Sequence, residues 1–335
     1  MKTKHLYSTN LGKAYVGDSL ILLDELEPES VDLVVTSPPF ALLRKKEYGN
    51  KEQHEYVDWL LTFTKKIQRI LKDTGSLVID LGGAYKKGIP VRSLYNYRFL
   101  IRACDEQGWN LAEEFFWFNP AKLPSPIEWV NKRKIRVKDS VNTVWWLSKS
   151  EFPKADVKNI LIAYSDRMKK LLDLGKKYYD PKLRPSGHDI SVGFNKDNGG
   201  AIPPNILPLP NTESNSQYLK YCKKIGEKGH PARFPADLPG FFIKYLTEPD
   251  DVVLDIFSGS NTTGWVAEQL TRKWIAFDSD HRYLANSSFR FLNGLSDQDS
   301  KSLHETLLGT TEAEIDLRGL MPTLFYEEQA DYQKK

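Results

Sequence analysis

Uninterrupted apolar runs along the chain predict buried β-strands. The clearest run is 31–36, Val-Asp-Leu-Val-Val-Thr, and the loop 37–40, Ser-Pro-Pro-Phe, follows it at once. A strand covered on both faces carries apolar residues without polar alternation, and two successive prolines can continue neither a strand nor a helix. The sequence therefore predicts a buried parallel strand that ends in a rigid loop. Such a loop is as typical of an ordinary strand end as of a ligand site.

A second run of this kind lies near the other end of the chain. Residues 251–256 form a predicted strand, and small polar residues lead from it into a helix at 265–270. The next strand is expected at 274–277 and ends at Asp278. Free N–H groups at a helix start suit a carboxylate or phosphate, and an acid at the end of the next strand suits ribose hydroxyl groups. This second copy favours a ligand site over an ordinary strand end.

Alternating strand and helix patterns continue in both halves of the chain. Further strands are expected at 13–17, 76–80, 111–118 and 139–146, and further helices at 19–26, 52–72, 97–107 and 240–246. Strands that alternate with helices indicate an α/β fold with a doubly wound, mostly parallel sheet. Asp80, at the end of the strand 76–80, suits either a turn cap or a hydrogen bond in the active site.

The texture of the sequence divides the chain into four parts. Residues 1–150 and 230–295 carry the strand and helix patterns, whereas 151–229 is rich in Gly, Pro and Asn. A long irregular stretch inside a compact enzyme is usually functional or disordered, so we expect sparse regular structure there. Residues 296–335 form a polar tail in which we expect at most one short helix.

The amino-acid composition limits the classes of protein to which this chain can belong. With 335 residues, of which 40% are hydrophobic, the chain can bury a large core and is expected to form one large domain with an insertion. No apolar run reaches 18 residues and the first ten lack a signal peptide, so we expect a cytoplasmic protein without a membrane partner. Cys104 and Cys222 form no metal-ligand spacing with the six histidines, so we expect neither a metal nor a disulfide framework.

Residues 36–40 and 255–264 together resemble two motifs of the DNA amino-methyltransferases, which methylate exocyclic amines of bases with S-adenosylmethionine (AdoMet). The first is similar to their catalytic (D/N/S)PP(Y/F/W) motif, and the second to their cofactor loop. The order, catalytic motif first, is that of the permuted β group. Similarity to the PvuII-type N4-cytosine methylases extends to about Leu295. Asn261 stands where many members have a glycine, but asparagine tolerates positive φ better than most residues.

The resemblance implies an AdoMet-dependent methyltransferase fold with circularly permuted motif order. It makes 1–150 the catalytic half, 151–229 an inserted target-recognition region and 230–295 the AdoMet-binding half. The implied catalytic residues are Ser37, Pro38, Pro39 and Phe40. The implied cofactor-binding residues are Asp18, Phe234, Pro235, Asp255, Phe257, Gly259, Ser260, Asn261, Thr262 and Asp278. Asp18 is equally well explained as the N-cap of the helix 19–26.

Basic side chains near the end of the catalytic half and in the recognition region are candidates for contacts with DNA phosphates. The candidates are Lys132, Arg133, Lys134, Arg136 and Lys138, together with Arg184 and His188 from the recognition region. A charge run is more often a solvated face, but Lys and Arg contacts with phosphates are what position a protein on DNA. The net charge of +3 and the pI of about 8.5 are compatible with nucleic acid without deciding for it.

The chemistry of the first motif narrows the reaction. An exocyclic amine is a poor nucleophile because its lone pair is delocalised, and the Ser37 oxygen and the Pro38 carbonyl can accept its two N–H bonds. Phe40 offers a flat face for a flipped base. Serine in the first position tends, in this family, to accompany cytosine N4, so the N4 amine is the expected target. Methylation at C5 needs a cysteine nucleophile, and neither cysteine lies beside the motifs.

Two other readings stay open at this point. One is methylation of adenine N6 in DNA, and the other is a DNA-binding relative that has lost catalysis, against which the intact motif argues. The leading reading is a modification enzyme of a restriction–modification system that acts on double-stranded DNA as a monomer or weak homodimer. The resemblance suggests CAGCTG as its target site.

Overall fold

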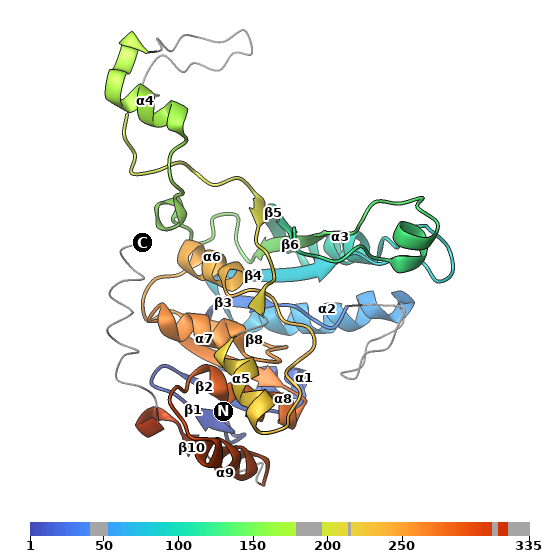
Figure 1. Ribbon diagram of the computed structural model, residues 1–335, viewed down its shortest axis with the longest axis vertical. Helices are drawn as coiled ribbons and strands as arrows, with labels where there is room; N and C mark the ends of the chain where they lie inside the picture. The colour runs from blue at the N-terminus through green and yellow to red at the C-terminus, as the bar shows by residue number, and fades with distance from the viewer. Residues whose placement is uncertain (41–52, 179–195, 214–215, 310–313, 321–335) are drawn as a thin grey trace. The chain divides into compact units, whose positions relative to one another are not determined.

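The computed structural model describes residues 1–40, 53–178, 196–213, 216–309 and 314–320. The chain divides into two compact units (Figure 1). The larger unit comprises Met1–Lys154 and Asn205–Lys335, and the smaller one comprises Ala155–Pro204. Within the described residues, no helix is both long and apolar enough to cross a membrane.

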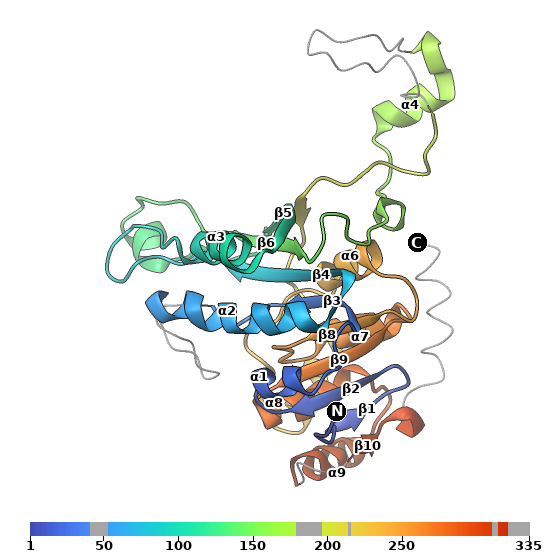
Figure 2. The same ribbon diagram turned by 180° about the vertical axis from the view of Figure 1, so that it is seen from behind.

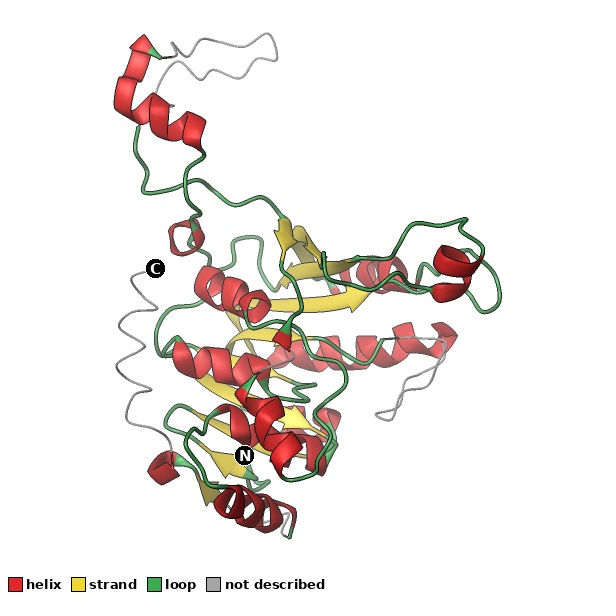
Figure 3. Ribbon diagram, viewed as in Figure 1, coloured by secondary structure: helices red, strands yellow, loops and turns green. Residues whose placement is uncertain are grey.

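One sheet runs through the larger unit (Figure 3). The order of its ten described strands is β10-β1-β2-β9-β8-β3-β4-β6-β5-β7. Their bounds are β1 Tyr7–Ser8, β2 Gly12–Val16, β3 Val31–Thr36, β4 Leu71–Gly82, β5 Asn110–Phe118, β6 Val141–Ser148, β7 Ile206–Pro208, β8 Val252–Asp255, β9 Lys273–Asp278 and β10 Ile315–Asp316. The neighbours β2, β9, β8, β3 and β4 are parallel, whereas β6 is antiparallel to β4 and to β5. The predicted doubly wound, mostly parallel sheet is confirmed.

Helices cover both faces of this sheet. Their bounds are α1 Ser19–Asp24, α2 Gln53–Ile70, α3 Tyr95–Gln107, α5 Gln217–Lys224, α6 Asp237–Leu246, α7 Thr262–Gln269, α8 His281–Ser287 and α9 Asp297–Leu308. Figures 1 and 2 show α1, α2 and α3 on one face, and α6 and α7 on the other. Val34 packs into the apolar cluster of the first face, while Leu33 and Val35 pack into that of the second. This double burial is why β3 carries apolar residues without alternation.

The chain leaves β3 and β8 in opposite directions along the sheet. From β3 it passes through α2 to β4, and from β8 it passes through α7 to β9 on the other side. The boundary between β3 and β8 is therefore the point where the strand order reverses. In open α/β sheets, ligands bind outside the carboxyl ends of the strands at such a point.

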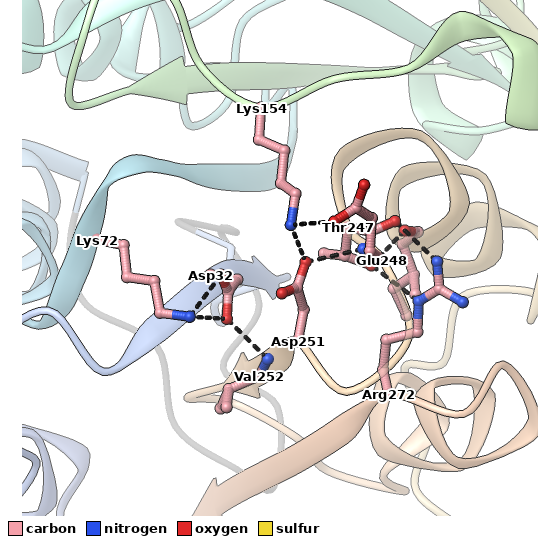
Figure 4. Close-up of polar contacts among 9 residues, drawn as sticks. Asp32, Lys72, Lys154, Thr247, Glu248, Asp251, Val252 and Arg272 are labelled. Atoms are coloured by element: carbon pink, nitrogen blue, oxygen red, sulfur yellow. Dashed lines mark hydrogen bonds and ion pairs between the residues drawn. The ribbon is translucent and has the colours of Figure 1, made fainter.

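Polar side chains tie the amino ends of β3, β4 and β8 together (Figure 4). The buried Asp32 carboxylate accepts from Lys72 Nζ at 2.8 Å and from the Val252 backbone N–H at 2.9 Å. Beside it, Lys154 Nζ lies 2.6 Å from an Asp251 carboxylate oxygen. These contacts fix the three strands at the edge of the sheet opposite to their carboxyl ends.

Two segments have more regular structure than the sequence suggested. In α5, Tyr218, Tyr221 and Cys222 are buried against the larger unit, although the segment lies within the predicted irregular region. Tyr and Cys on a short helix give a weak amphipathic signal, because apolar periodicity is read from longer windows. The tail also departs from expectation, since β10 pairs with β1 and α9 buries Leu307.

Little regular structure is found in the described residues of the smaller unit, 155–178 and 196–204. These residues contain α4 (Asp166–Leu174), two short 3-10 turns and an antiparallel bridge between Ile162 and Ala201. The Tyr164 hydroxyl accepts from the Asn198 N–H at 2.7 Å, which ties its two chain segments together. This unit lies within the predicted target-recognition region, and that role stays a prediction.

Candidate active site

A cavity of about 710 Å³ opens at the carboxyl ends of β3, β4, β8 and β9. All of its lining residues belong to the larger unit. Among the predicted site residues, those on its wall are Asp18, Ser37, Pro38, Pro39, Phe40, Phe234, Phe257, Gly259, Ser260, Thr262 and Asp278. The wall thus combines the first motif with the second, as expected for strands that end at the same edge of a sheet.

Ser37 has its hydroxyl oriented by a buried acid. Its Oγ donates to Asp80 Oδ2 at 3.0 Å, and Asn142 Nδ2 donates to the other Asp80 oxygen at 3.0 Å. Because the Ser37 proton is committed to Asp80, the Ser37 lone pairs are free to accept a hydrogen bond from a ligand in the cavity. Of the two roles considered for Asp80, the structure favours the hydrogen bond in the active site.

Burial raises the pKa of Asp80 to about 6. The carboxyl group is 4% exposed, so removal from water disfavours its charged form. The hydrogen bonds from Asn142 and Ser37 and the positive charge of Lys122 oppose this effect. Asp80 is therefore an anion near neutral pH that gains a proton in mildly acidic solution.

Phe40 lies against the end of β4. A Cβ atom added at Gly82 would come within 2.5 Å of Phe40 Cε2, which no side chain could accommodate without movement. Glycine at this position lets the aromatic ring approach the β4 backbone closely, next to the Ser37–Asp80 pair. The absence of a side chain at Gly82 therefore leaves the space that the Phe40 ring occupies on the cavity wall.

The loop after β8 contains a residue in the left-handed region. Asn261 has φ of 51° and ψ of 44°, and its side-chain oxygen accepts from the Gly264 N–H at 3.1 Å, which caps α7. Its side-chain N–H donates to the Tyr7 hydroxyl at 2.9 Å. Asparagine thus meets the backbone requirement of the missing glycine. The fully buried side chain lies behind the loop rather than on the cavity wall.

Two further residues predicted for the cofactor site lie away from the wall. The Asp255 carboxylate is 2% exposed and accepts hydrogen bonds within the protein, from Thr36 and Thr263 among others. Pro235 precedes α6 and is also absent from the wall, although its neighbour Phe234 lines it. Position along the chain showed where the loop lies, but it did not show which side chains point into the cavity.

Asp278 ends β9 on the cavity wall, where it also holds the cofactor loop. Its two carboxylate oxygens accept from the Gly259 N–H at 2.6 Å and the Asp280 N–H at 2.8 Å. Burial raises its pKa to about 6. Each oxygen keeps a second lone pair for a ligand hydroxyl group. Asp18 also lines the cavity while its carboxylate caps α1 through the Leu20 N–H, so both roles considered for it are compatible.

Several contributors to the site carry no motif. Arg290 supports the cofactor loop from behind, donating to the Ser260 carbonyl oxygen at 2.6 Å and pairing with the Glu213 carboxylate at 3.1 Å. Trp59 and Phe63 from α2 contact Phe257, with ring centroids 5.7 Å and 5.0 Å away. Asn142 was hidden within an apolar strand. A polar residue at that position of the strand was a signal that the sequence offered. The strand register that places Asn142 beside Asp80 could not be read from the sequence.

The basic run 132–138 begins at the last residue of the π-helical turn η1 (Glu128–Lys132), follows it along the chain and is exposed. Lys132 and Arg133 pair with Glu128, at 3.3 Å and 3.0 Å. Arg136 and Lys138 donate to backbone carbonyl groups, and Lys134 has a positive φ of 54°. Exposure leaves these side chains accessible to a polyanion. Arg184 and His188 lie outside the described residues.

Within the described residues, no group of three or more His, Cys, Asp or Glu side chains could hold a metal ion.

Comparisons with known proteins agree with this arrangement. The family model described as DNA methylase matches residues 31–288. The chain is 62% identical over 306 residues to the type II methyltransferase M.PvuII of Proteus hauseri, with 91% of each chain covered. It is 25% identical over 293 residues to M.BglII of Bacillus subtilis, covering 87% of this chain and 71% of that one.

A solved structure gives the same result for the fold. It is the PvuII DNA methyltransferase (cytosine-N4-specific), with a TM-score of 0.77 and 53% identity, covering 94% of this chain and 98% of that one. The family model spans both motifs and most of the sheet, and the M.PvuII match extends over nearly all of both chains. This chain therefore belongs to the DNA methylase family.

Proposed function

We propose that this chain is a site-specific DNA methyltransferase, which transfers the methyl group of AdoMet to the exocyclic N4 amine of cytosine in double-stranded DNA. The observation that carries the proposal is the Ser37 hydroxyl, bonded to Asp80 at 3.0 Å and placed in one cavity with the loop after β8. Its close relative M.PvuII is a type II methyltransferase, so we infer the modification role of a restriction–modification system, acting on the cell's own DNA in the cytoplasm.

The loop after β8 fits AdoMet. The Ser258 hydroxyl lines the cavity, is buried, and has no hydrogen-bond partner within the described part of the chain, so it is available to a ligand atom. Asp278 offers lone pairs for ribose hydroxyl groups, and the apolar rings of Phe234 and Phe257 lie on the same wall. When bound, AdoMet supplies an electrophilic methyl group on a sulfonium centre.

The residues of the first motif prepare the amine. The Ser37 oxygen and the Pro38 carbonyl accept its two N–H bonds, which draws the nitrogen lone pair out of conjugation with the ring. Transfer of the methyl group would form the N–C bond and break the carbon–sulfur bond, whose electron pair would stay on the sulfur as a neutral thioether. The nitrogen loses one proton, and the Ser37 hydroxyl can take it while passing its own proton to Asp80. The Asp80 carboxylate thus provides the base through a neutral hydroxyl.

We infer that the target base leaves the helix to reach this site. The amine cannot meet Ser37 inside a stacked duplex, and the Phe40 ring provides a face on which an extruded base can rest. Phe40 and Ser37 lie in the same loop after β3, so the stacked base and the hydrogen-bonded amine can be aligned together.

The product of the reaction tests this proposal. Purified protein is incubated with AdoMet and unmethylated plasmid DNA, and the digested nucleosides are analysed by mass spectrometry. We expect N4-methylcytosine, and sequencing of methylated bases then gives the target site. N6-methyladenine as the sole product would establish the adenine reading instead, and 5-methylcytosine would exclude the mechanism.

Asp278 should contribute measurably to AdoMet binding. Substitution Asp278→Ala removes an acceptor on the cavity wall and the anchor of the Gly259 N–H, so we expect binding to weaken by about 1–3 kcal/mol. Isothermal titration calorimetry without DNA measures the change. The control is Asp105→Ala, which removes an exposed carboxylate from α3. Unchanged affinity of Asp278→Ala would remove this residue from the AdoMet site.

The basic run should contribute to DNA binding without regard to sequence. In the double variant Lys132→Gln and Lys134→Gln, we expect the slope of log affinity against log salt to fall by roughly 0.9 for each phosphate that the protein no longer neutralises. Fluorescence anisotropy with specific and unrelated duplexes measures it, and both should weaken alike. The control replaces the exposed Lys65 and Lys301 with glutamine. An unchanged slope with lower thermal stability would identify the run as a structural surface.

A further inference from the structure

The Asp255 carboxylate connects the two motifs across the boundary between β8 and β3. Its Oδ1 accepts from Thr36 Oγ1 at 2.8 Å and from the Phe257 N–H at 3.1 Å, and its Oδ2 accepts from Thr263 Oγ1 at 2.7 Å. Thr36 directly precedes Ser37, whereas the other two donors flank the cofactor loop. One side chain therefore holds both walls of the cavity from behind.

The hydrogen bonds that Asp255 accepts from Thr36, Phe257 and Thr263, called the bridge below, lie beyond the last backbone pairs between β3 and β8. The Cα partners of β3 and β8 are Leu33 with Val253 and Val34 with Leu254, and no pairing between these strands extends to Thr36. Beyond those pairs β3 stays paired with β4 as far as Thr36, and β8 with β9 as far as Asp255, but β3 and β8 no longer pair with each other. Because backbone hydrogen bonds do not continue there, the spacing of the loops depends on side chains.

Burying the charged Asp255 carboxylate costs free energy, which argues that the bridge has a function. Asp255 is 2% exposed, and its hydrogen-bond donors are two hydroxyl groups and one backbone N–H. Burial raises its pKa to about 6, so the fold holds the charged form at neutral pH at some expense. A buried apolar residue would hold the sheet together without that expense.

We propose that Asp255 is a positioning residue, which acts through Thr36 to set the distance and angle between the Ser37 hydroxyl and the cofactor loop. The inference rests on the proposed function, because it assigns that distance to the path of methyl transfer. Methyl transfer needs donor and acceptor in line, and a displacement of about 1 Å can cost roughly 100-fold in rate. Asp255 then acts on the rate through geometry and touches neither ligand.

Removing one hydroxyl group at a time separates the two ends of the bridge. Thr36→Val breaks the contact with the catalytic strand and keeps the shape of the side chain, while Thr36→Ser keeps the hydroxyl. Thr263→Val breaks the contact within the cofactor loop. The matched control is Thr64→Val, because Thr64 is equally buried and donates to Gln107 Oε1 at 2.7 Å, away from the cavity.

The readouts are turnover at saturating AdoMet and DNA, AdoMet affinity by calorimetry, and the melting temperature. Tritiated AdoMet with plasmid DNA reports methyl transfer to any base. For Thr36→Val we expect turnover to fall roughly 10- to 100-fold while AdoMet affinity changes less than twofold. Thr36→Ser should restore most of the turnover, Thr263→Val should weaken AdoMet binding, and Thr64→Val should lower only the melting temperature.

Each contrary result has a distinct meaning. Full turnover of Thr36→Val in an active enzyme would overturn the positioning role alone. A loss of turnover that Thr64→Val shares at the same melting temperature would also overturn it, because the bridge would then be an ordinary stabilising contact. A wild-type protein that transfers no methyl group to any DNA would overturn the proposed function, and this inference with it.

Discussion

Ser37→Ala should lower turnover by about 100-fold or more, the magnitude expected when one positioned polar group is removed from a catalytic site. The variant loses the acceptor for the amine N–H and the hydroxyl that connects this proton with Asp80. Pro38 and Pro39 hold the loop so rigidly that another acceptor can hardly take its place. Single-turnover methylation at saturating AdoMet and DNA measures the effect.

Binding should be nearly unaffected by the same substitution. Ser37 lies on the wall shared by both ligands, but its hydrogen bond matters most when the amine becomes a nucleophile. We therefore expect similar affinities for AdoMet and DNA, measured by calorimetry and anisotropy. The control is Ser30→Ala, which removes an exposed hydroxyl that bonds the Glu27 carbonyl oxygen. Turnover of Ser37→Ala within a few-fold of wild type would contradict the proposed mechanism.

Asp80→Asn should lower turnover by about 100- to 1,000-fold, within the range for loss of a general base. The amide is nearly the same shape as the carboxylate, so the cavity wall should persist. It cannot accept a proton, however, and its N–H₂ group must face either Ser37 or Asn142, both of which donate to Asp80 in the native enzyme. Thermal melting distinguishes this chemical loss from unfolding.

The pH dependence of the rate should identify the ionised form of Asp80 as the active one. Burial raises its pKa to about 6, so the carboxylate is present above this pH and is lost as the pH falls through it. We expect kcat/KM for DNA, measured at saturating AdoMet, to decline below about pH 6. Asp255 and Asp278 have pKa values raised to about 6 as well, so the comparison with Asp80→Asn makes the assignment. An unchanged acid limb in that variant would assign the decline to another group.

Apolar patterning was sufficient to predict the central sheet. β3, β8 and β9 lie where uninterrupted apolar runs indicated, because helices on both faces leave few polar positions in those strands. Short or aromatic elements were missed. The apolar face of α5 consists of Tyr and Cys, and β10 has only two residues, so neither gives a periodic signal before its partners are known.

The order of strands and loops along the chain was sufficient to predict which loops form the candidate site. Loops that follow parallel strands must meet at one edge of the sheet, so the sequence alone predicts that Ser37 lies near Gly259. Which side chains face the cavity depends on register and on local backbone angles. Asp80 meets Asn142 because β4 and β6 pair in one particular antiparallel register, and Asp255 points behind its loop. Those features follow from tertiary packing and have no counterpart in the local sequence.

The position of β3 in the sheet has a consequence for synthesis of the protein. Thr36 and Asp255, at the ends of β3 and β8, are 219 residues apart in the chain. Ribosomes add about 5–20 residues per second, so β3 waits roughly 10–45 seconds for its second neighbour. During that time it is an apolar edge strand with unpaired backbone groups, which readily pairs with other chains. A chain truncated before β8 should therefore aggregate, and no fragment that carries the Ser37 loop alone should serve as a soluble catalytic half.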